Sequence, residues 1–587
     1  MSTEKDLRSR QAGTALAGLA LIGSGWWLGQ LPVDTDQLAG IPPLGQLVDG
    51  PLIGFGVATL VVAVIWAVWT SLPAVRLRRI LGEEGWADWR DLRAGLGAGG
   101  LRRVYGAEVR PDLKGKRAAA TEYGLPVGRL VTGGLGLRGR QVYFPHSYSV
   151  LVAGPPGAAK SSEMANFVRH APACMYISTS KTEFVRHTAD LRAHKGRVWV
   201  FNPAGLGGVP STFGWNPVDG CHDMEMAKKR ATAMVRGGAA VSNEHEFFKQ
   251  KAVEIIRCYL MAAALAGLGM GAVHEWATHP DDPTPVDILQ SYPSYAPGNW
   301  VSTLVSYLDS DPKSRSNYYA TVTPCVSFLD NPAVIRACNP TSDQRFDLEE
   351  FLTGSDTLYV INGEDSSLAP LMTALTEHIQ AGARVVAERS ADERLAPGLI
   401  LLLDEVAQTT PVPLDKWSSE LRGLGITVVA GIQGRAQLET RYGREATRTI
   451  CQSMTMKIVV SAGMMSDDED LRYFTGLAGS RSVTKVSHGE TDGANGSATS
   501  TNRHKVEEPV ITTERLTRLP RGYAFIKGPT EHAAVVKFPR GFKEAAADAR
   551  RLDRAAARKA EAEARAAERS RETEPAATVA EPIEQEA

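Results

Sequence analysis

Hydrophobic and polar positions divide the chain into stretches with different patterns. Two apolar runs, residues 12–31 and 52–72, are each long enough to cross ~30 Å of hydrocarbon as a helix. From residue 148 onward, short apolar runs of strand type alternate with helical segments. Between Phe213 and Phe346 the strand signals nearly vanish and helical patterns replace them. We therefore expect two transmembrane helices, an α/β core and an all-helical domain inserted into that core.

The core strands are predicted by their apolar runs. These runs cover residues 148–153, 174–177, 198–201, 357–361, 399–403, 426–430, 457–460 and 523–526. Helical segments separate most of them, which favours a mainly parallel, doubly wound sheet.

Charge adds an orientation to the N-terminal part. No Lys or Arg occurs from Gln11 to Val75, whereas residues 76–150 carry fourteen Lys and Arg against seven Asp and Glu. The loop between the apolar runs has only negative charges, so the positive-inside bias predicts a multi-pass protein of the cell (inner) membrane with both termini in the cytoplasm. A cleavable signal peptide is the alternative for the first run, but no small-residue cleavage site follows Trp26 and Trp27. The basic segment is typical of a solvated juxtamembrane face and also suits anionic membrane lipids.

The overall composition excludes some classes of protein. Over 587 residues, 65 Lys and Arg nearly balance 66 Asp and Glu, which excludes a globally basic nucleic-acid coat. The six cysteines are scattered without a Cys-x-x-Cys pair, so neither a disulfide framework nor structural zinc is expected.

A glycine-rich segment follows the first predicted core strand. Its residues are Gly154, Pro155, Pro156, Gly157, Ala158, Ala159, Lys160, Ser161 and Ser162. Strand, glycine loop, Lys-Ser and helix is the order of a P-loop, whose amides and helix N-terminus bind phosphate oxygens. We predict that Lys160 reaches the β- and γ-phosphates of ATP and that the Ser161 hydroxyl binds Mg²⁺. Ala159 stands where glycine is usual; because this position begins the helix, we expect a right-handed α conformation there.

Two later strands end in residues that suit the same site. One apolar run ends at Asp404 and Glu405, and such a strand in P-loop NTPases delivers an Asp to magnesium and a Glu to the attacking water. Another leads to Gln433, which we predict senses the γ-phosphate or positions water. The predicted catalytic residues are Lys160, Glu405 and Gln433, and the predicted magnesium ligands are Ser161 and Asp404.

These signals define the expected domains. They are a membrane anchor (1–75), a basic juxtamembrane segment with the start of the nucleotide-binding domain (76–147), a P-loop ATPase domain (148–220 and 346–540), an all-helical insert (221–345) and a C-terminal part (541–587). Residues 479–502 are polar and rich in Gly, Ser and Thr, which predicts a mobile loop. The C-terminal part is predicted to be a charged helix followed by a disordered acidic tail.

The ordered motifs resemble the type IV coupling proteins of conjugation and type IV secretion, the TraG/TraD-like family. The resemblance covers most of the chain. It rests on the two N-terminal spans, the P-loop, a divergent Asp-x-Lys-x-Glu segment at Ser178–Glu183, the Asn-Pro pairs at 202–203 and 216–217, Leu403–Glu405, residues 433–443 and a closing segment at 507–522. Ser178 departs from the Asp that the family often has.

The resemblance implies a RecA-like fold and a function. It implies an inner-membrane ATPase that works as a homo-hexamer and uses ATP and Mg²⁺. Such an ATPase couples a relaxase-bound single strand of DNA, or protein substrates, to a type IV secretion channel during conjugative transfer. It also implies an arginine from a neighbouring subunit, for which Arg345, Arg422 and Arg435 are candidates.

Two other functions remain open from the sequence. A double-stranded DNA translocase of the FtsK type shares this core, but the predicted sheet is followed by an Ala/Glu/Arg tail rather than a DNA-reading domain. A membrane docking platform with a degenerate P-loop would bind nucleotide without hydrolysing it.

Overall fold

The structure, a computed structural model, describes residues 77, 80–81, 84–134, 136–238, 246–363, 366–493 and 496–572. The chain divides into two compact units, Met1–Glu83 and Glu84–Ala587. The predicted spans at 12–31 and 52–72 and the acidic end beyond residue 572 lie outside the described residues. Within the described part, no helix combines the length and apolar character needed to cross a bilayer.

An eleven-stranded mixed sheet forms the centre of the second unit, in the order β2-β1-β13-β12-β9-β3-β8-β7-β4-β6-β5. The parallel part consists of β3 (Val150–Ala153), β4 (Met175–Thr179), β5 (Val198–Phe201), β6 (Thr357–Ile361), β7 (Leu399–Leu403), β8 (Ile426–Ile432) and β9 (Met456–Val460). The antiparallel extension consists of β1 (Gly124–Leu130), β2 (Gln141–Pro145), β12 (Tyr523–Lys527) and β13 (Ala534–Lys537). The expected mainly parallel α/β sheet is thus confirmed, and an antiparallel edge is added to it.

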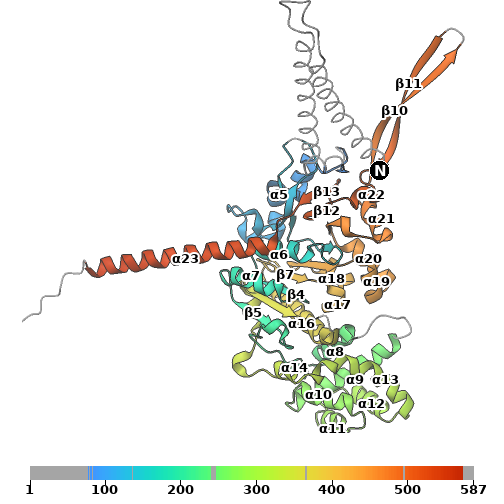
Figure 1. Ribbon diagram of the computed structural model, residues 1–587. Helices are drawn as coiled ribbons and strands as arrows, with labels where there is room; N and C mark the ends of the chain where they lie inside the picture. Colours follow the sequence, from blue (N-terminus) through green and yellow to red (C-terminus); the bar gives the residue numbers. More distant parts are fainter. Residues whose placement is uncertain are drawn as a thin grey trace, which may run out of the picture. The chain divides into compact units, whose positions relative to one another are not determined.

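Helices cover the sheet between these strands (Figure 1). They are α6 (Lys160–His170), α7 (Glu183–Ala193), α16 (Ala369–Arg389), α17 (Val406–Thr409), α18 (Leu414–Glu420), α19 (Arg435–Tyr442), α20 (Arg444–Ser453), α21 (Asp468–Gly476) and α22 (Thr513–Leu516). The strands β3, β4, β6, β7 and β8 are buried along their whole length, because helices pack on both faces of a parallel sheet. This explains why their sequences are continuous apolar runs rather than alternating ones.

Eight helices lie between β5 and β6 in the described sequence. They are α8 (Met224–Gly238), α9 (Glu246–Leu265), α10 (Met270–Thr278), α11 (Thr284–Ser291), α12 (Gly298–Leu308), α13 (Pro312–Val326), α14 (Pro332–Ala337) and α15 (Leu348–Thr353). Figure 1 shows α8 to α14 gathered on one side of the sheet, with α8 packed against α16. The exact limits of this inserted domain remain a prediction.

The segment predicted as a mobile loop is instead a long β-hairpin. Strands β10 (Ser480–Gly493) and β11 (Gly496–Pro509) pair antiparallel as a separate two-stranded sheet. Figure 1 shows this ribbon extending away from the large sheet. The prediction of a loop is wrong because Thr and Val favour paired strands, although Ser, Thr and Gly together are also typical of loops.

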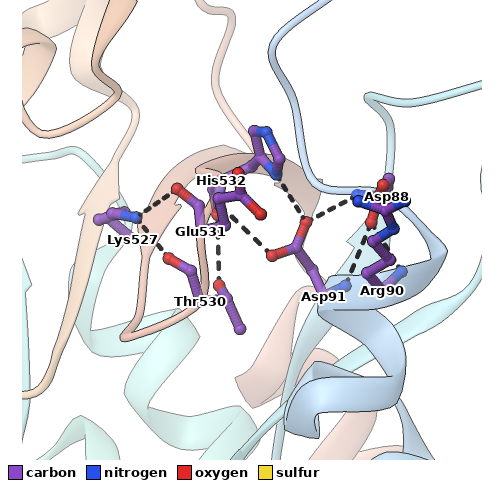
Figure 2. Close-up of polar contacts among 7 residues, drawn as sticks. All are labelled: Asp88, Arg90, Asp91, Lys527, Thr530, Glu531 and His532. Carbon is purple, nitrogen blue, oxygen red and sulfur yellow. Dashed lines mark hydrogen bonds and ion pairs between the residues drawn. The ribbon is translucent and has the colours of Figure 1, made fainter.

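The basic segment after the first unit folds against the antiparallel edge of the sheet. It forms α4 (Trp89–Asp91) and α5 (Ala98–Val109) before entering β1. Asp91 is 3% exposed and accepts hydrogen bonds from the backbone N–H and the Nδ1 of His532, which lies between β12 and β13 (Figure 2). Beside it, Lys527 donates to the carbonyls of Thr530 and Glu531. These contacts fasten the start of the second unit to the far end of its sequence.

The last described element is α23 (Gly541–Glu572). Its first turns pack on α6 and α7, and Ala545 and Ala549 are buried there beside Leu191. Figure 1 shows the rest of the helix projecting from the body, in agreement with the predicted charged helix.

Candidate nucleotide site

The predicted P-loop lies between β3 and α6. Gly154 donates its N–H to the carbonyl of Ile432 at the end of β8, and the Ala158 N–H donates to the Pro155 carbonyl. Gly157 has a φ of 77°, a left-handed conformation that glycine adopts without strain. Lys160 is the first residue of α6 and is 7% exposed. The loop therefore places a lysine and free helix N–H groups together, which is the arrangement that binds phosphate.

Ala159 does not have the expected conformation. Its φ of 69° and ψ of 26° are left-handed, at the N-cap of α6. The expected right-handed geometry is wrong because Ala159 is the N-cap residue that precedes α6, and the helix begins only at Lys160. An L-residue with a Cβ pays about 1–2 kcal/mol for this conformation, so the absence of the usual glycine introduces local strain.

The end of β7 brings a carboxylate to this loop. The Ser161 hydroxyl donates a 3.0 Å hydrogen bond to Oδ2 of Asp404, which is 3% exposed. The other oxygen of that carboxylate, Oδ1, is buried without a hydrogen-bond partner among the described residues. The two residues predicted to bind magnesium are thus in direct contact, with one carboxylate oxygen unused.

Glu405 and Gln433 also meet at this edge of the sheet. The Gln433 side-chain amide donates to Oε1 of Glu405 at 3.3 Å, and the Ser180 hydroxyl donates to Oε2 at 3.1 Å. Glu405 itself has a left-handed φ of 54°. Non-glycine residues in this region store strain and are concentrated at functional sites. Two donors therefore orient the carboxylate that was predicted to act on water.

The carboxyl ends of parallel strands share one edge of the sheet, which explains why these residues converge. Ala153 is in register with Ile432, and Leu403 with Ala430 on the other side of β8. Each loop that follows these strands therefore opens on the same space, as expected at the switch point of an α/β sheet.

Burial shifts the pKa values of two charged groups in the space between these loops. Burial lowers the pKa of Lys160, although Asp404 and Glu405 oppose the shift. Burial likewise raises the pKa of Asp404, and the Lys160 charge acts against that shift. The positive charge of the exposed Lys181 lowers the pKa of both Lys160 and Asp404, so Lys181 lies within electrostatic range of the site. Charged groups that burial destabilises gain most from a ligand of opposite charge.

Three residues of the site were not singled out in the sequence. Ser180 contacts Glu405, as described above, and the Ser461 hydroxyl donates a 2.8 Å hydrogen bond to the Ala158 carbonyl of the P-loop. Asn362 is fully buried after β6 and donates to the Thr409 carbonyl, while its Oδ1 has no partner among the described residues. Their common signal is a polar residue directly after a core strand.

The three candidate arginines lie in different places. Arg435 begins α19 two residues after Gln433, with Glu439 and Glu469 near its guanidinium. Arg422 precedes β8, at the opposite edge of the sheet, and lies beside Glu108. Arg345 is exposed before α15. Ser178, where the family often has Asp, is fully buried and its hydroxyl shares a 2.7 Å hydrogen bond with Thr410.

Residues 398–521, which contain Asp404, Glu405 and Gln433, match the family described as the TraM recognition site of TraD and TraG. The resemblance to the coupling proteins is confirmed. No curated protein matches the sequence significantly.

Solved structures of the bacterial conjugative coupling protein TrwB are similar to this chain. The trigonal form of TrwBdeltaN70 with sulphate has a TM-score of 0.50 at 17% identity and covers 76% of this chain and 92% of its own. The unbound monoclinic form has a TM-score of 0.49 at 18% identity and covers 68% and 87%. TrwB with ADP and Mg²⁺ has a TM-score of 0.47 at 18% identity and covers 68% and 87%. At this identity the likeness to the sulphate form shows a shared fold.

Proposed function

We propose that this chain is a membrane-anchored P-loop ATPase that couples DNA or protein substrates to a type IV secretion channel during conjugative transfer. The observation that carries the enzymatic part is the contact between Ser161, on the P-loop helix, and Asp404, at the end of β7. It joins the two halves of a nucleotide site across the sheet. The TraD/TraG match over residues 398–521 supports the conjugative role.

The donor set fits a magnesium ion. Mg²⁺ binds oxygen ligands and is usually held by one or two protein groups together with substrate phosphates. The Ser161 hydroxyl and the Asp404 carboxylate supply such oxygens, and Asp404 Oδ1 has no other partner in the described part of the chain. In the proposed site these two residues would hold Mg²⁺, which would supply positive charge to neutralise the phosphates of ATP.

The remaining residues orient the reactants. The N–H groups at the start of α6 and the Lys160 ammonium bind the phosphates of ATP and stabilise the charge that develops during transfer. Glu405 aligns the attacking water, and the donors on Gln433 and Ser180 hold its carboxylate in place. A change in Gln433 upon loss of the γ-phosphate would be passed to α19, which begins two residues later.

The proposal places the two predicted spans in the cell membrane with both termini in the cytoplasm, where nucleotide is available. It includes a homo-hexamer in which an arginine of the adjacent subunit completes each site. Arg435 is well placed for such a role by sequence, but its side chain lies near Glu439 and Glu469. The inserted helices α8 to α15 are the proposed contact for cargo, either DNA with its relaxase or protein.

A docking platform that binds nucleotide without turnover is the second candidate. Two observations support this second candidate: the left-handed conformation of Ala159, and the buried Ser178, which supplies no carboxylate to the site. Both functions require the same nucleotide pocket, and they differ only in hydrolysis.

The deciding experiment is an ATPase assay on the purified full chain, with and without single-stranded DNA. We expect Mg²⁺-dependent hydrolysis that Lys160→Ala abolishes, because the lysine contacts the phosphates. Lys114→Ala, at an exposed lysine outside the P-loop and the helical insert, serves as the matched control and should retain full activity. Nucleotide binding without hydrolysis in the wild type would support the docking platform, and absence of both would refute the proposed site.

A further inference from the structure

The C-terminal helix α23 has two halves with different surroundings. In the first half Phe542 contacts Phe184 and His187 of α7, and Ala545 and Ala549 are buried. Arg169 of α6 forms ion pairs with both Glu544 and Asp548. From Asp553 to Ala566, every residue is exposed. The packed first half, which we call the root of α23, therefore holds the second half of the helix in solvent.

Five exposed arginines share one side of this helix. They are Arg550, Arg551, Arg554, Arg558 and Arg565, which we call the arginine stripe. At about 100° per residue they all lie within an arc of about 100°, on the side opposite Ala545, Ala549 and Leu552. The same arc between residues 550 and 566 contains one carboxylate, that of Glu561. Along the axis the stripe extends for about 22 Å, at about 1.5 Å per residue.

The stripe does not serve the stability of the helix. Within the described residues, Arg551 is its one member with an ion pair, a 3.3 Å contact to Asp548. Arg550, Arg554 and Arg558 follow one another at i, i+4 spacing, where like charges destabilise a helix by about 0.2–0.5 kcal/mol per pair. By contrast, Lys559 on another side has an acidic partner at i+4, Glu563, at 3.8 Å. Because repulsion between these arginines lowers the stability of the helix, we expect the stripe to have a negatively charged ligand.

We propose that the arginine stripe binds the phosphate backbone of a nucleic acid. Arginine is the preferred residue for phosphate groups, because its planar guanidinium presents several donors at once. A bilayer surface is disfavoured, since a membrane-bound helix needs a large apolar face. Residues 553–566 contain no apolar side chain larger than alanine. The same lack of apolar anchors disfavours a protein interface with a hydrophobic centre.

The root of α23 connects this surface to the nucleotide site. A Cβ on Gly541 would lie 2.0 Å from the Ser162 carbonyl oxygen and 2.6 Å from the Asn166 nitrogen, so α23 starts directly on the backbone of α6. Lys160 and Ser161 belong to the first turn of that same helix. Nucleic acid bound along the stripe is therefore in mechanical contact with the helix that holds the nucleotide.

The test is binding of a fluorescein-labelled single-stranded oligonucleotide of about 20 nucleotides to the full chain, followed by anisotropy over a range of salt concentrations. The variant carries Arg550→Gln, Arg554→Gln, Arg558→Gln and Arg565→Gln, since glutamine keeps helix propensity. We expect affinity to fall at least about tenfold and the salt slope to decrease by about 3, at about 0.7 per phosphate contact. Circular dichroism verifies that the helix is retained.

A charge-matched control removes four exposed lysines outside the helical insert and outside α23, through Lys114→Gln, Lys116→Gln, Lys505→Gln and Lys537→Gln. We expect this variant to bind the oligonucleotide as the wild type does. Equal losses in both variants, or unchanged binding by the stripe variant, would overturn the inference. Displacement of the oligonucleotide by poly-glutamate at equal charge would overturn it in favour of an acidic protein partner. Hydrolysis without nucleic acid should be unchanged, so failure here is distinct from failure of the proposed ATPase.

Discussion

The hydroxyl of Ser161 and the carboxylate of Asp404 lie 3.0 Å apart, although 243 positions separate them in the sequence. Removing the negative charge should disable metal binding while leaving the shape of the site intact. We expect Asp404→Asn to reduce Mg²⁺-dependent hydrolysis by at least about a hundredfold, an effect typical of lost charge stabilisation in an active site. Chelation of Mg²⁺ should have the same effect on the wild type and little further effect on the variant.

Asp281→Asn is a suitable control for this change. Asp281 is on the surface, where its side chain is 79% exposed and pairs with Arg315. Equal hydrolysis by Asp404→Asn and Asp281→Asn would contradict the assignment of Asp404 to the metal.

The left-handed Ala159 predicts a stabilising substitution. Ala159→Gly removes a Cβ that costs about 1–2 kcal/mol in this conformation, against about 0.5–1 kcal/mol of extra entropy in the unfolded chain. We expect a small rise in the thermal midpoint and hydrolysis equal to or above that of the wild type. The same change at Ala320, exposed in the right-handed helix α13, should lower stability. A thermal midpoint below that of the wild type for Ala159→Gly would contradict the inference that Ala159 is strained.

Glu163 predicts a pH effect on stability. It is fully buried on α6, both carboxylate oxygens lack partners among the described residues, and burial raises its pKa well above the usual 4.5. Because the folded pKa exceeds the unfolded one, folding takes up a proton, and stability falls as pH rises from about 4.5 toward the folded pKa. Each unit of difference corresponds to about 1.4 kcal/mol.

The neutral substitution Glu163→Gln should remove this dependence. We expect it to raise the unfolding midpoint at pH 7.5, with the difference from the wild type shrinking as pH falls to 4.5. Glu246→Gln, whose side chain is 80% exposed, should show no such trend. Parallel pH profiles for Glu163→Gln and the wild type would show that Glu163 does not carry the effect.

A substitution at Gly541 tests whether the nucleotide site depends on the contact between α23 and α6. A Cβ there would overlap the backbone of α6 at Ser162, so Gly541→Ala must move one of the two helices. We expect a loss of stability of about 1–3 kcal/mol and weaker binding of a fluorescent ATP analogue. Gly298→Ala introduces the same methyl group with nothing within 4 Å, so it should cause no loss of stability and should leave nucleotide affinity unchanged. If Gly541→Ala binds the nucleotide with wild-type affinity, the position of α23 does not affect the nucleotide site.

The sequence predicts the central strands and the candidate residues well because both depend on local patterns. Short, fully apolar runs favour buried strands of a parallel sheet, and polar residues that follow such strands gather at the carboxyl edge of the sheet. Asp404, Glu405 and Gln433 were found in this way. Ser180 and Ser461 follow the same rule, but a serine after a strand is too common to stand out until its partner, 225 or 303 positions away, is known.

Other features depend on long-range packing that no local pattern records. β1 contains two glycines and a proline, which are poor strand formers, and it exists because β2 and β13 pair with it. The left-handed turn at Ala159 is set by the path from β3 into α6 rather than by alanine itself. The hairpin of β10 and β11 was missed because its polar composition suits a loop and a solvated ribbon equally.

Because α23 packs directly on the P-loop helix α6, a small tilt of α6 would produce a larger displacement at the far end of α23. Its 32 residues make an arm of about 48 Å at about 1.5 Å per residue. If the arm follows α6 as one body, a tilt of about 5° at the nucleotide displaces the far end by about 4 Å, comparable to one turn of a helix. Chemical events on the scale of a single phosphate would then reach a surface far from the site as a stroke large enough to shift the register of a bound strand.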